Sequence, residues 1–299
     1  MASNPTTFSL NPGNYGIPTR EELIDHRIWD SHYHGFFYGG IAGHHATMFY
    51  VERMGIERVI ALDIATGSRA RAKGSAAPFL AIENQQKEIL EKDASRISGI
   101  IRIDPAHPAD SCRKMEQWIR QGPCIGIKYA GGYEGVTCSH ANNDAIISLC
   151  RELNAVIYIH TWIKVGGSPR FPGGGNGGAE STPMDVAILA RRFPDVPMIC
   201  GHSGGDWELG ARAIRSCENV SFEFSGSDPH SGQVDYAVNE LGADRIVWGG
   251  HGPSRSYATE LSKVFDSNLN QADRMKVLGG NCRRLAAPIF RKKGLQMKA

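Results

Sequence analysis

Residues 28–33 read Ile-Trp-Asp-Ser-His-Tyr, the first of eight short runs rich in β-branched or apolar residues. Gly, Pro or polar residues bound each run, which is typical of strands. The other seven runs are residues 57–63, 97–103, 124–129, 155–160, 196–201, 219–224 and 244–249. Near-continuous apolar runs of this kind indicate strands that helices cover, as in a parallel sheet.

Segments with a helical period of apolar residues lie between these runs. They are residues 77–92, 109–121, 142–153, 183–193, 231–241 and 255–265. In 142–153, for example, Ile146, Leu149 and Leu153 share one face, as in a helix that packs on a sheet. Strands that alternate with helices indicate right-handed βαβ units, and eight units favour a closed barrel over an open sheet. No Gly-x-Gly-x-x-Gly follows the first run, so a dinucleotide-binding sheet is the weaker interpretation.

The predicted fold class is therefore α/β, a single (β/α)8 TIM barrel with an N-terminal arm and extra C-terminal helices. Residues 1–25 contain three prolines and little periodicity, so we interpret them as the arm. Residues 26–299 form the predicted barrel domain, and 270–290 carry the added helices. No shift in composition marks a linker between domains.

Composition excludes several classes of protein. The chain of 299 residues has 33 Lys plus Arg against 31 Asp plus Glu, a net charge of +2, and no excess positive charge for binding nucleic acid. No apolar run is long enough to cross a membrane and the N-terminus is polar, so we expect no membrane partner and a cytoplasmic protein. The 7 cysteines are scattered without a Cys-x-x-Cys pair, which indicates buried thiols rather than disulfides or a cysteine zinc site.

Five of the 11 histidines fall where predicted strands end: His32, His34, His160, His202 and His251. Active sites of such barrels lie at the carboxyl ends of the strands. His32 and His34 are two residues apart, so their side chains point to the same side of a strand. A lone histidine is usually structural, but five on one rim favour a site for a divalent metal ion. Imidazole ligands suit zinc first, with manganese, iron or nickel as alternatives.

Four further residues are candidates for substrate binding. Lys128 and Tyr129 end the fourth strand, although a structural lysine is an equal alternative for Lys128. Arg170 lies in the glycine-rich segment 166–178, which we expect to form a mobile loop over the barrel mouth, with a solvated connector as the alternative. Arg255 follows His251 closely, where a guanidinium can clamp a carboxylate, or it is a surface arginine.

The sequence resembles the amidohydrolase-related branch of the metal-dependent amidohydrolase superfamily, from Asp30 to about Leu285. The resemblance rests on seven motifs in order: DSHYH (30–34), GIKY (126–129), IHT (159–161), ICGHSGGDWE (199–208), GADRIVWGG (242–250), PSRS (253–256) and LGGNCRRL (278–285). It implies a (β/α)8 barrel with one or two metal ions. It also implies that His32, His34 and His160 are metal ligands and that His202 is a second-metal ligand or an acid/base group.

The eighth strand departs from the family. The family usually has Gly-Ser-Asp there, with the aspartate as metal ligand and proton acceptor, whereas this chain has Gly249-Gly250-His251. A histidine can ligate or act as a base, but it supplies no negative charge. A working all-histidine site, altered chemistry and a site without metal all remain open. Glu223 or Asp228, near the seventh strand, is a candidate for a compensating carboxylate.

The main hypothesis for function is a metal-dependent hydrolase. Metal-activated water would attack an amide, ester or lactone of a small molecule that we expect to be anionic, with His202 or His251 taking the proton. Two alternatives stay open: a metal-dependent decarboxylase or C–C lyase of the same family, and a catalytically silent barrel that binds a partner. The resemblance to the family further implies that the protein is a homo-oligomer.

Overall fold

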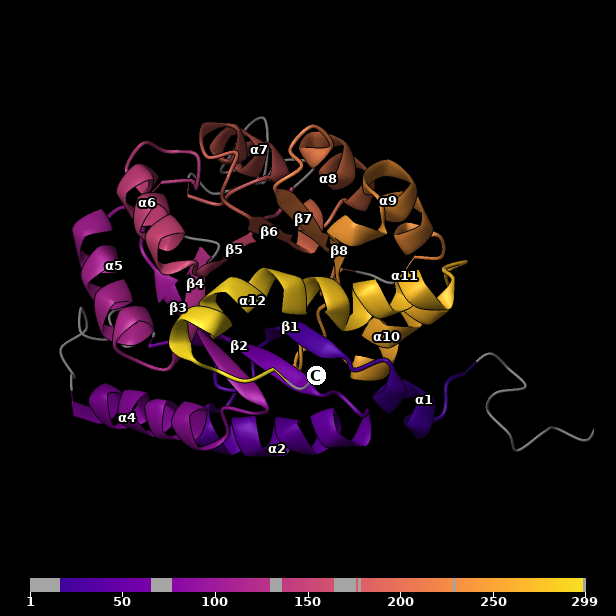
Figure 1. The fold of residues 1–299 in the computed structure, drawn as a ribbon, viewed down its shortest axis with the longest axis horizontal. Coiled ribbons are helices and arrows are strands. Elements are labelled where there is room, and N and C mark those ends of the chain that lie inside the picture. Colours follow the sequence, from indigo (N-terminus) through magenta and orange to yellow (C-terminus); the bar gives the residue numbers. More distant parts are fainter. Residues whose placement is uncertain are drawn as a thin grey trace, which may run out of the picture.

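Eight parallel strands form one sheet in sequential order, with helices on its outside (Figure 1). The computed structural model describes residues 17–65, 77–129, 136–163, 176, 179–227 and 230–297. The strands are β1 Trp29–Tyr33, β2 Arg58–Ile64, β3 Ile97–Ile103, β4 Cys124–Tyr129, β5 Val156–His160, β6 Met198–Gly201, β7 Val220–Glu223 and β8 Ile246–Val247. This architecture confirms the predicted (β/α)8 barrel.

Helices lie between the strands along the chain, and further helices lie before β1 and after β8. The α-helices are α1 Arg20–Asp25, α2 Gly40–Arg53, α4 Ala77–Lys92, α5 Pro108–Met115, α6 Asn143–Leu153, α7 Pro183–Arg192, α8 Trp207–Ile214, α9 Gln233–Leu241, α10 Tyr257–Phe265, α11 Gln271–Met275 and α12 Asn281–Lys293. Short helical turns are η2 Glu116–Arg120, η3 His202–Gly204, η4 Ala243–Arg245 and η5 Lys276–Gly280. Within the described parts of the chain, no helix is long and apolar enough to span a membrane.

The seam between β8 and β1 is closed by single hydrogen bonds instead of a regular ladder. Ser31 donates from both its main-chain N and its Oγ to the main-chain oxygen of Trp248, at 3.3 and 2.8 Å. Farther along, the main-chain N of Gly250 donates to Oδ1 of Asp30 at 2.7 Å. The aspartate of the Asp-x-His-x-His motif therefore holds the first strand against the loop that carries His251.

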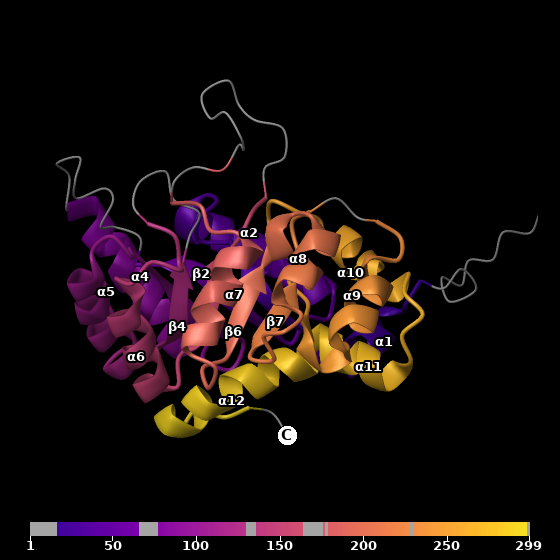
Figure 2. The same ribbon diagram turned by 90° about the horizontal axis from the view of Figure 1, so that it is seen from above.

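The C-terminal helices cover the end of the barrel at which the strands begin (Figure 2). Asn281 donates from Nδ2 to the main-chain oxygens of Ala243 and Ile246, at 2.7 and 2.8 Å, just before and within β8. Near the far end of α12, Lys293 donates from Nζ to the main-chain oxygen of Gly122, shortly before β4. Because this end is covered, access to the barrel interior is at the carboxyl ends of the strands.

The N-terminal arm predicted for residues 1–25 is described only from residue 17 onward. Its described part contains the short helix α1, which begins with a capping box between Thr19 and Glu22. Each of these residues accepts a hydrogen bond from the other's main-chain N, which stabilises the first turn. The remaining arm residues, 1–16, lie outside the described residues.

Candidate active site

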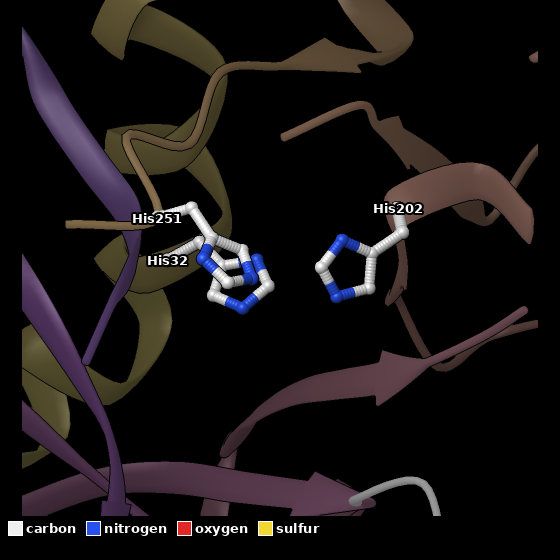
Figure 3. A group of neighbouring side chains, drawn as sticks. All are labelled: His32, His202 and His251. Atoms are coloured by element: carbon white, nitrogen blue, oxygen red, sulfur yellow. The ribbon is translucent and has the colours of Figure 1, made fainter. Parts of the chain in front are cut away.

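Three histidines converge at the barrel mouth: His32 on β1, His202 directly after β6 and His251 in the loop after β8 (Figure 3). The ring of His32 lies 4.7 Å from that of His202 and 4.4 Å from that of His251, measured between centroids. His34 lies 4.8 Å from His251, and His160 at the end of β5 lies 4.6 Å from His202. The five histidines singled out in the sequence thus form one cluster.

Irregular backbone geometry aims these side chains. The pairing of β1 with β2 shifts register between Asp30 and Tyr33, a bulge that spans His32. His202 and His251 have positive φ angles, 58° and 51°, which non-glycine residues rarely adopt. Such strain persists only where the surrounding structure enforces it, and it is common at functional sites.

The Nδ1 atom of His32 is held by a buried network. It lies 2.5 Å from the hydroxyl of Tyr158, which donates to Oε2 of Glu223 at 2.6 Å. Since that hydroxyl proton goes to the carboxylate, the hydroxyl oxygen accepts from Nδ1. Ser225 Oγ also lies 2.8 Å from the same nitrogen. The proton of His32 is therefore on Nδ1, and the lone pair of Nε2 points into the cluster.

Three other histidines have a similar arrangement. His202 Nδ1 lies 2.6 Å from the main-chain oxygen of Ser225, which only accepts. His251 Nδ1 contacts the hydroxyl of Ser254, and that hydroxyl donates to the main-chain oxygen of His251 at 3.0 Å. His34 Nδ1 lies 3.1 Å from Oδ2 of Asp63, a close contact without hydrogen-bond geometry. An acceptor therefore lies beside Nδ1 in all three residues and hydrogen-bonds it in His202 and His251, which leaves Nε2 free.

This donor set fits a divalent cation of the zinc, manganese, iron or nickel type. One ring nitrogen from each of His32, His202 and His251 lies within 4.8 Å of the others. The Nε2 atoms of His32 and His34 are 2.9 Å apart, so two lone pairs face each other unless a cation lies between them. Metal-bound histidines usually donate their other ring N–H to an acceptor, an arrangement that His32, His202 and His251 share.

Burial keeps the imidazoles neutral, which is the form that binds metal. It lowers the pKa of His34 to about 4, with the charge of Lys128 adding to the effect and Asp63 opposing it. Burial and the neighbouring His202 and His34 lower the pKa of His251 to about 2. Burial also lowers the pKa of His32, His160 and His202.

The acidic residues near the cluster contact its outer side. Glu223, proposed from sequence as a compensating carboxylate, is fully buried and accepts from the main-chain N of His202 at 2.9 Å. It also lies 3.4 Å from Nδ1 of His32, on the side opposite Nε2. Among the described residues, no carboxylate belongs to the compact group of potential ligands. The other carboxylate proposed from sequence, Asp228, lies outside the described residues.

The sequence-based interpretation missed Asp63, which ends β2. It lies 3.1 Å from both His34 Nδ1 and Lys128 Nζ through the same atom, Oδ2. Burial raises its pKa, but Lys128, His34 and Arg102 together outweigh burial and hold that pKa well below the ordinary value. A polar residue at the carboxyl end of a strand was the signal that found the histidines, and it applies equally to Asp63.

Of the four residues predicted to bind substrate, Lys128 is buried in the barrel interior and paired with Asp63. Burial lowers the pKa of its ammonium, while Asp63 opposes the shift. Tyr129, the next residue on β4, points to the opposite side of the strand, and the thiols of Cys150, Cys138 and Cys112 are among its neighbours. Tyr129 is therefore not among the residues that line the pocket above the histidine cluster, and its role in substrate binding stays a prediction. Arg170 lies outside the described residues.

A pocket of about 350 Å³ opens above the cluster. It is lined by Tyr38, His160, Trp162, Glu180, His202, Gly226, His251, Ser254 and Arg255. Arg255 reaches it as expected, but its Nε and Nη2 donate to the main-chain oxygen of Gly226, at 3.2 and 2.9 Å. The aromatic walls Tyr38 and Trp162 are bordered by neutral imidazoles, the guanidinium of Arg255 and the carboxylate of Glu180, so the pocket combines flat apolar surface with polar groups.

The chain thus combines a (β/α)8 barrel, a fold that many enzymes share, with a histidine cluster of the kind that can hold a metal ion. The chain belongs to the amidohydrolase family, whose model, described as Amidohydrolase, matches residues 30–285. No curated protein is similar enough in sequence to match the chain.

Solved structures of decarboxylases share the fold at low sequence identity. The chain resembles 5-carboxyvanillate decarboxylase from Sphingomonas paucimobilis at 15% identity and a TM-score of 0.61, over 81% of this chain and 82% of that one. It resembles 2,6-dihydroxybenzoate decarboxylase from Rhizobium at 14% and 0.60, over 87% and 98%. The dihydroxybenzoic acid decarboxylase from Polaromonas sp. JS666, with bound manganese and the inhibitor 2-nitroresorcinol, matches at 17% and 0.59, over 80% and 84%.

Proposed function

We propose that this protein is a metal-dependent decarboxylase of a small, planar aromatic or enolic acid. The observation that carries the proposal is the all-imidazole character of the described cluster of His32, His202 and His251. Neutral ligands leave the full positive charge of a divalent ion uncompensated. Such a site favours an anionic substrate that can bind through a carboxylate and a neighbouring hydroxyl oxygen.

The bound ion would supply the positive charge that holds these substrate oxygens. His32 and His34 are its best-placed ligands, because their Nε2 atoms are 2.9 Å apart and both Nδ1 atoms face acceptors. Manganese joins zinc as a candidate because a decarboxylase of the same fold binds it. The identity of the ion does not change the roles of the protein side chains.

The pocket walls orient a flat substrate. Trp162 contacts His202 edge to face, with ring centroids 5.6 Å apart, and Tyr38 similarly contacts His34 at 6.1 Å. These rings supply apolar surface, and they limit the water that reaches the imidazoles. Arg255 at the rim adds positive charge for a substrate carboxylate.

In this proposal the ion is held by the other histidines, and His202 is not a ligand but supplies the proton that replaces CO2. Its Nδ1–H is fixed on Ser225, so Nε2 is the nitrogen that gains and loses the proton. The negative charge of a bound substrate would raise the low pKa of His202 and favour the imidazolium. Nε2–H then protonates the carbon that carries the carboxylate, the C–C bond breaks, its electron pair returns to the ring, and CO2 leaves.

Hydrolysis is the second candidate, and the free Nε2 of His251 favours it. This residue stands where the family usually has the proton-accepting aspartate, and its imidazole lines the pocket. A neutral imidazole can accept a proton from water. The substrate would then be an ester, lactone or amide.

The test compares the two reactions on one preparation loaded with Mn²⁺ or Zn²⁺. We expect CO2 release from 2,6-dihydroxybenzoate or 5-carboxyvanillate, equal to the phenol formed, abolished by chelation and by His202→Ala. The variant His140→Gln, which changes an exposed histidine, is the matched control and should keep full activity. Turnover of lactones, esters or amides without CO2 release from either acid would overturn the proposal.

A further inference from the structure

Asp63 at the end of β2 is held in an unusual backbone conformation. Its φ angle is 62°, and the pairing of β2 with β3 shifts register between Ala61 and Ile64. A bulge re-aims a side chain, and a positive φ in a non-glycine residue persists only under constraint from its surroundings. Both irregularities fall where β2 meets the histidine cluster.

The re-aimed carboxylate lies between one histidine and one lysine. Oδ2 of Asp63 accepts a hydrogen bond from Nζ of Lys128 at 3.1 Å and lies at the same distance from Nδ1 of His34, a charged contact without hydrogen-bond geometry. The side chains of Asp63 and Lys128 are each 4% exposed, so water does not screen their pairing. Arg102 Nη1 lies 3.8 Å from the other oxygen, Oδ1. The Lys128 ammonium and Arg102 therefore keep Asp63 in its charged form, in which it only accepts hydrogen bonds.

We propose that Asp63 is a positioning residue that fixes His34 in the Nδ1–H tautomer, so that the Nε2 lone pair faces Nε2 of His32 and the metal position. An imidazole free of such a partner distributes its proton between both nitrogens. With the proton on Nε2, His34 would present N–H instead of a lone pair to the cluster. Asp63 thus acts through His34 and does not itself touch the substrate.

This inference rests on the metal site and not on the reaction. Carboxylates that accept from metal-bound histidines change metal affinity by about 10–100-fold when removed. The tautomer of His34 can be observed in metal-free protein without any substrate. If the protein does not decarboxylate the proposed acids, the tautomer measurement still tests this inference.

The experiment must separate the tautomer from the cost of an unpaired buried lysine. Asp63→Ala alone leaves the Lys128 ammonium without its carboxylate, which destabilises the fold. The informative pair is therefore Lys128→Met, which keeps Asp63 beside His34 with Arg102 as its remaining cation, and the double variant Asp63→Ala/Lys128→Met. Asp104→Asn, which neutralises an exposed carboxylate after β3, is the control for lost negative charge at the rim.

Two readouts apply to each protein: the ¹⁵N chemical shifts of the His34 ring, assigned by their loss in His34→Gln, and the affinity for Mn²⁺ or Zn²⁺ in competition with a chelator. We expect a proton-bearing Nδ1 in wild type, Lys128→Met and Asp104→Asn. The double variant should show a mixture of tautomers and bind metal about 10–100-fold more weakly than Lys128→Met. A double variant with the tautomer and metal affinity of Lys128→Met would overturn the proposal.

Discussion

His202 donates a hydrogen bond from Nδ1 to the main-chain oxygen of Ser225, at 2.6 Å. The hydroxyl of the same serine lies 2.8 Å from Nδ1 of His32. One residue in the loop after β7 therefore contacts histidines from β1 and from the turn after β6. The geometry of this loop sets the distance between two imidazoles of the histidine cluster, and the next residue, Gly226, makes that distance sensitive to substitution.

Gly226→Ala should disrupt the cluster without removing any functional side chain. Gly226 has a φ of 77°, and a Cβ there would lie 2.7 Å from Cδ2 of His251 and 3.1 Å from Nδ1 of His202. The conformation alone costs about 1–2 kcal/mol for alanine, and the two rings must also move. We expect activity to fall at least about tenfold through displaced imidazoles. The measurements are metal content, Tm and turnover. Wild-type values for all three would contradict the prediction.

Glu223→Gln should weaken both stability and metal binding. Glu223 accepts from Tyr158, from the main-chain N of His202 and, through Oε1, from that of Ser225 at 2.8 Å. An amide offers one oxygen for these donors, so at least one loses its partner, at about 1–3 kcal/mol. Denaturant unfolding and chelator competition give the two quantities. The milder Tyr158→Phe, which leaves the main-chain donors satisfied, should lower both less, and the reverse order would contradict the assigned role.

His44 provides a pH-dependent contribution to stability that is independent of the metal. Burial, with the neighbouring His45 adding to it, lowers the pKa of His44 to about 4, and its Nδ1 lies 2.8 Å from the hydroxyl of Tyr33. The unfolded chain binds the proton more tightly, so folding stability should be intact above about pH 6.5 and fall as the pH drops toward 4.

In metal-free protein, we expect wild type to lose on the order of 1–3 kcal/mol more than His44→Gln across this range. The glutamine can keep a hydrogen bond to Tyr33 but does not titrate. Urea unfolding of both proteins at several pH values measures the difference. Parallel curves would show that His44 makes no such contribution.

His251→Asp restores the residue that the family usually has after the eighth strand. The substitution adds a negative charge beside an anionic substrate, so we expect KM for the acid substrate to rise about tenfold or more while the metal stays bound. His251→Asn removes the imidazole without adding charge and separates the two effects. An unchanged or lower KM in His251→Asp would argue against charge as the reason for the histidine.

Much of the fold could be predicted from sequence because its signals are local. The boundaries of β3, β4 and α4 match the expected segments, since each has a clear apolar pattern between breakers. Helices α2 and α8 were not predicted. α2 begins with glycine and leaves Phe49 and Tyr50 exposed, so its sequence lacks a clean apolar stripe.

The site could be predicted only in part, from the rule that polar residues at the carboxyl ends of barrel strands form the active site. The rule identified His32, His160 and their partners, but strand parity sends Tyr129 to the outer face, although it is adjacent to Lys128. Contacts such as that of His202 with the main-chain oxygen of Ser225 depend on backbone geometry after β7 and have no residue-type signature. The direction of the Asp63 side chain depends on a bulge, which the apolar pattern of β2 does not reveal.

The most direct test of the account is a crystal structure of metal-loaded protein with anomalous scattering data at the edge of the loaded metal. We predict one strong anomalous peak within coordination distance of the Nε2 atoms of His32 and His34, with His160 or His251 completing the set. A crystal grown with excess metal that shows no peak among these histidines would contradict the central claim. So would a peak bound through their Nδ1 atoms.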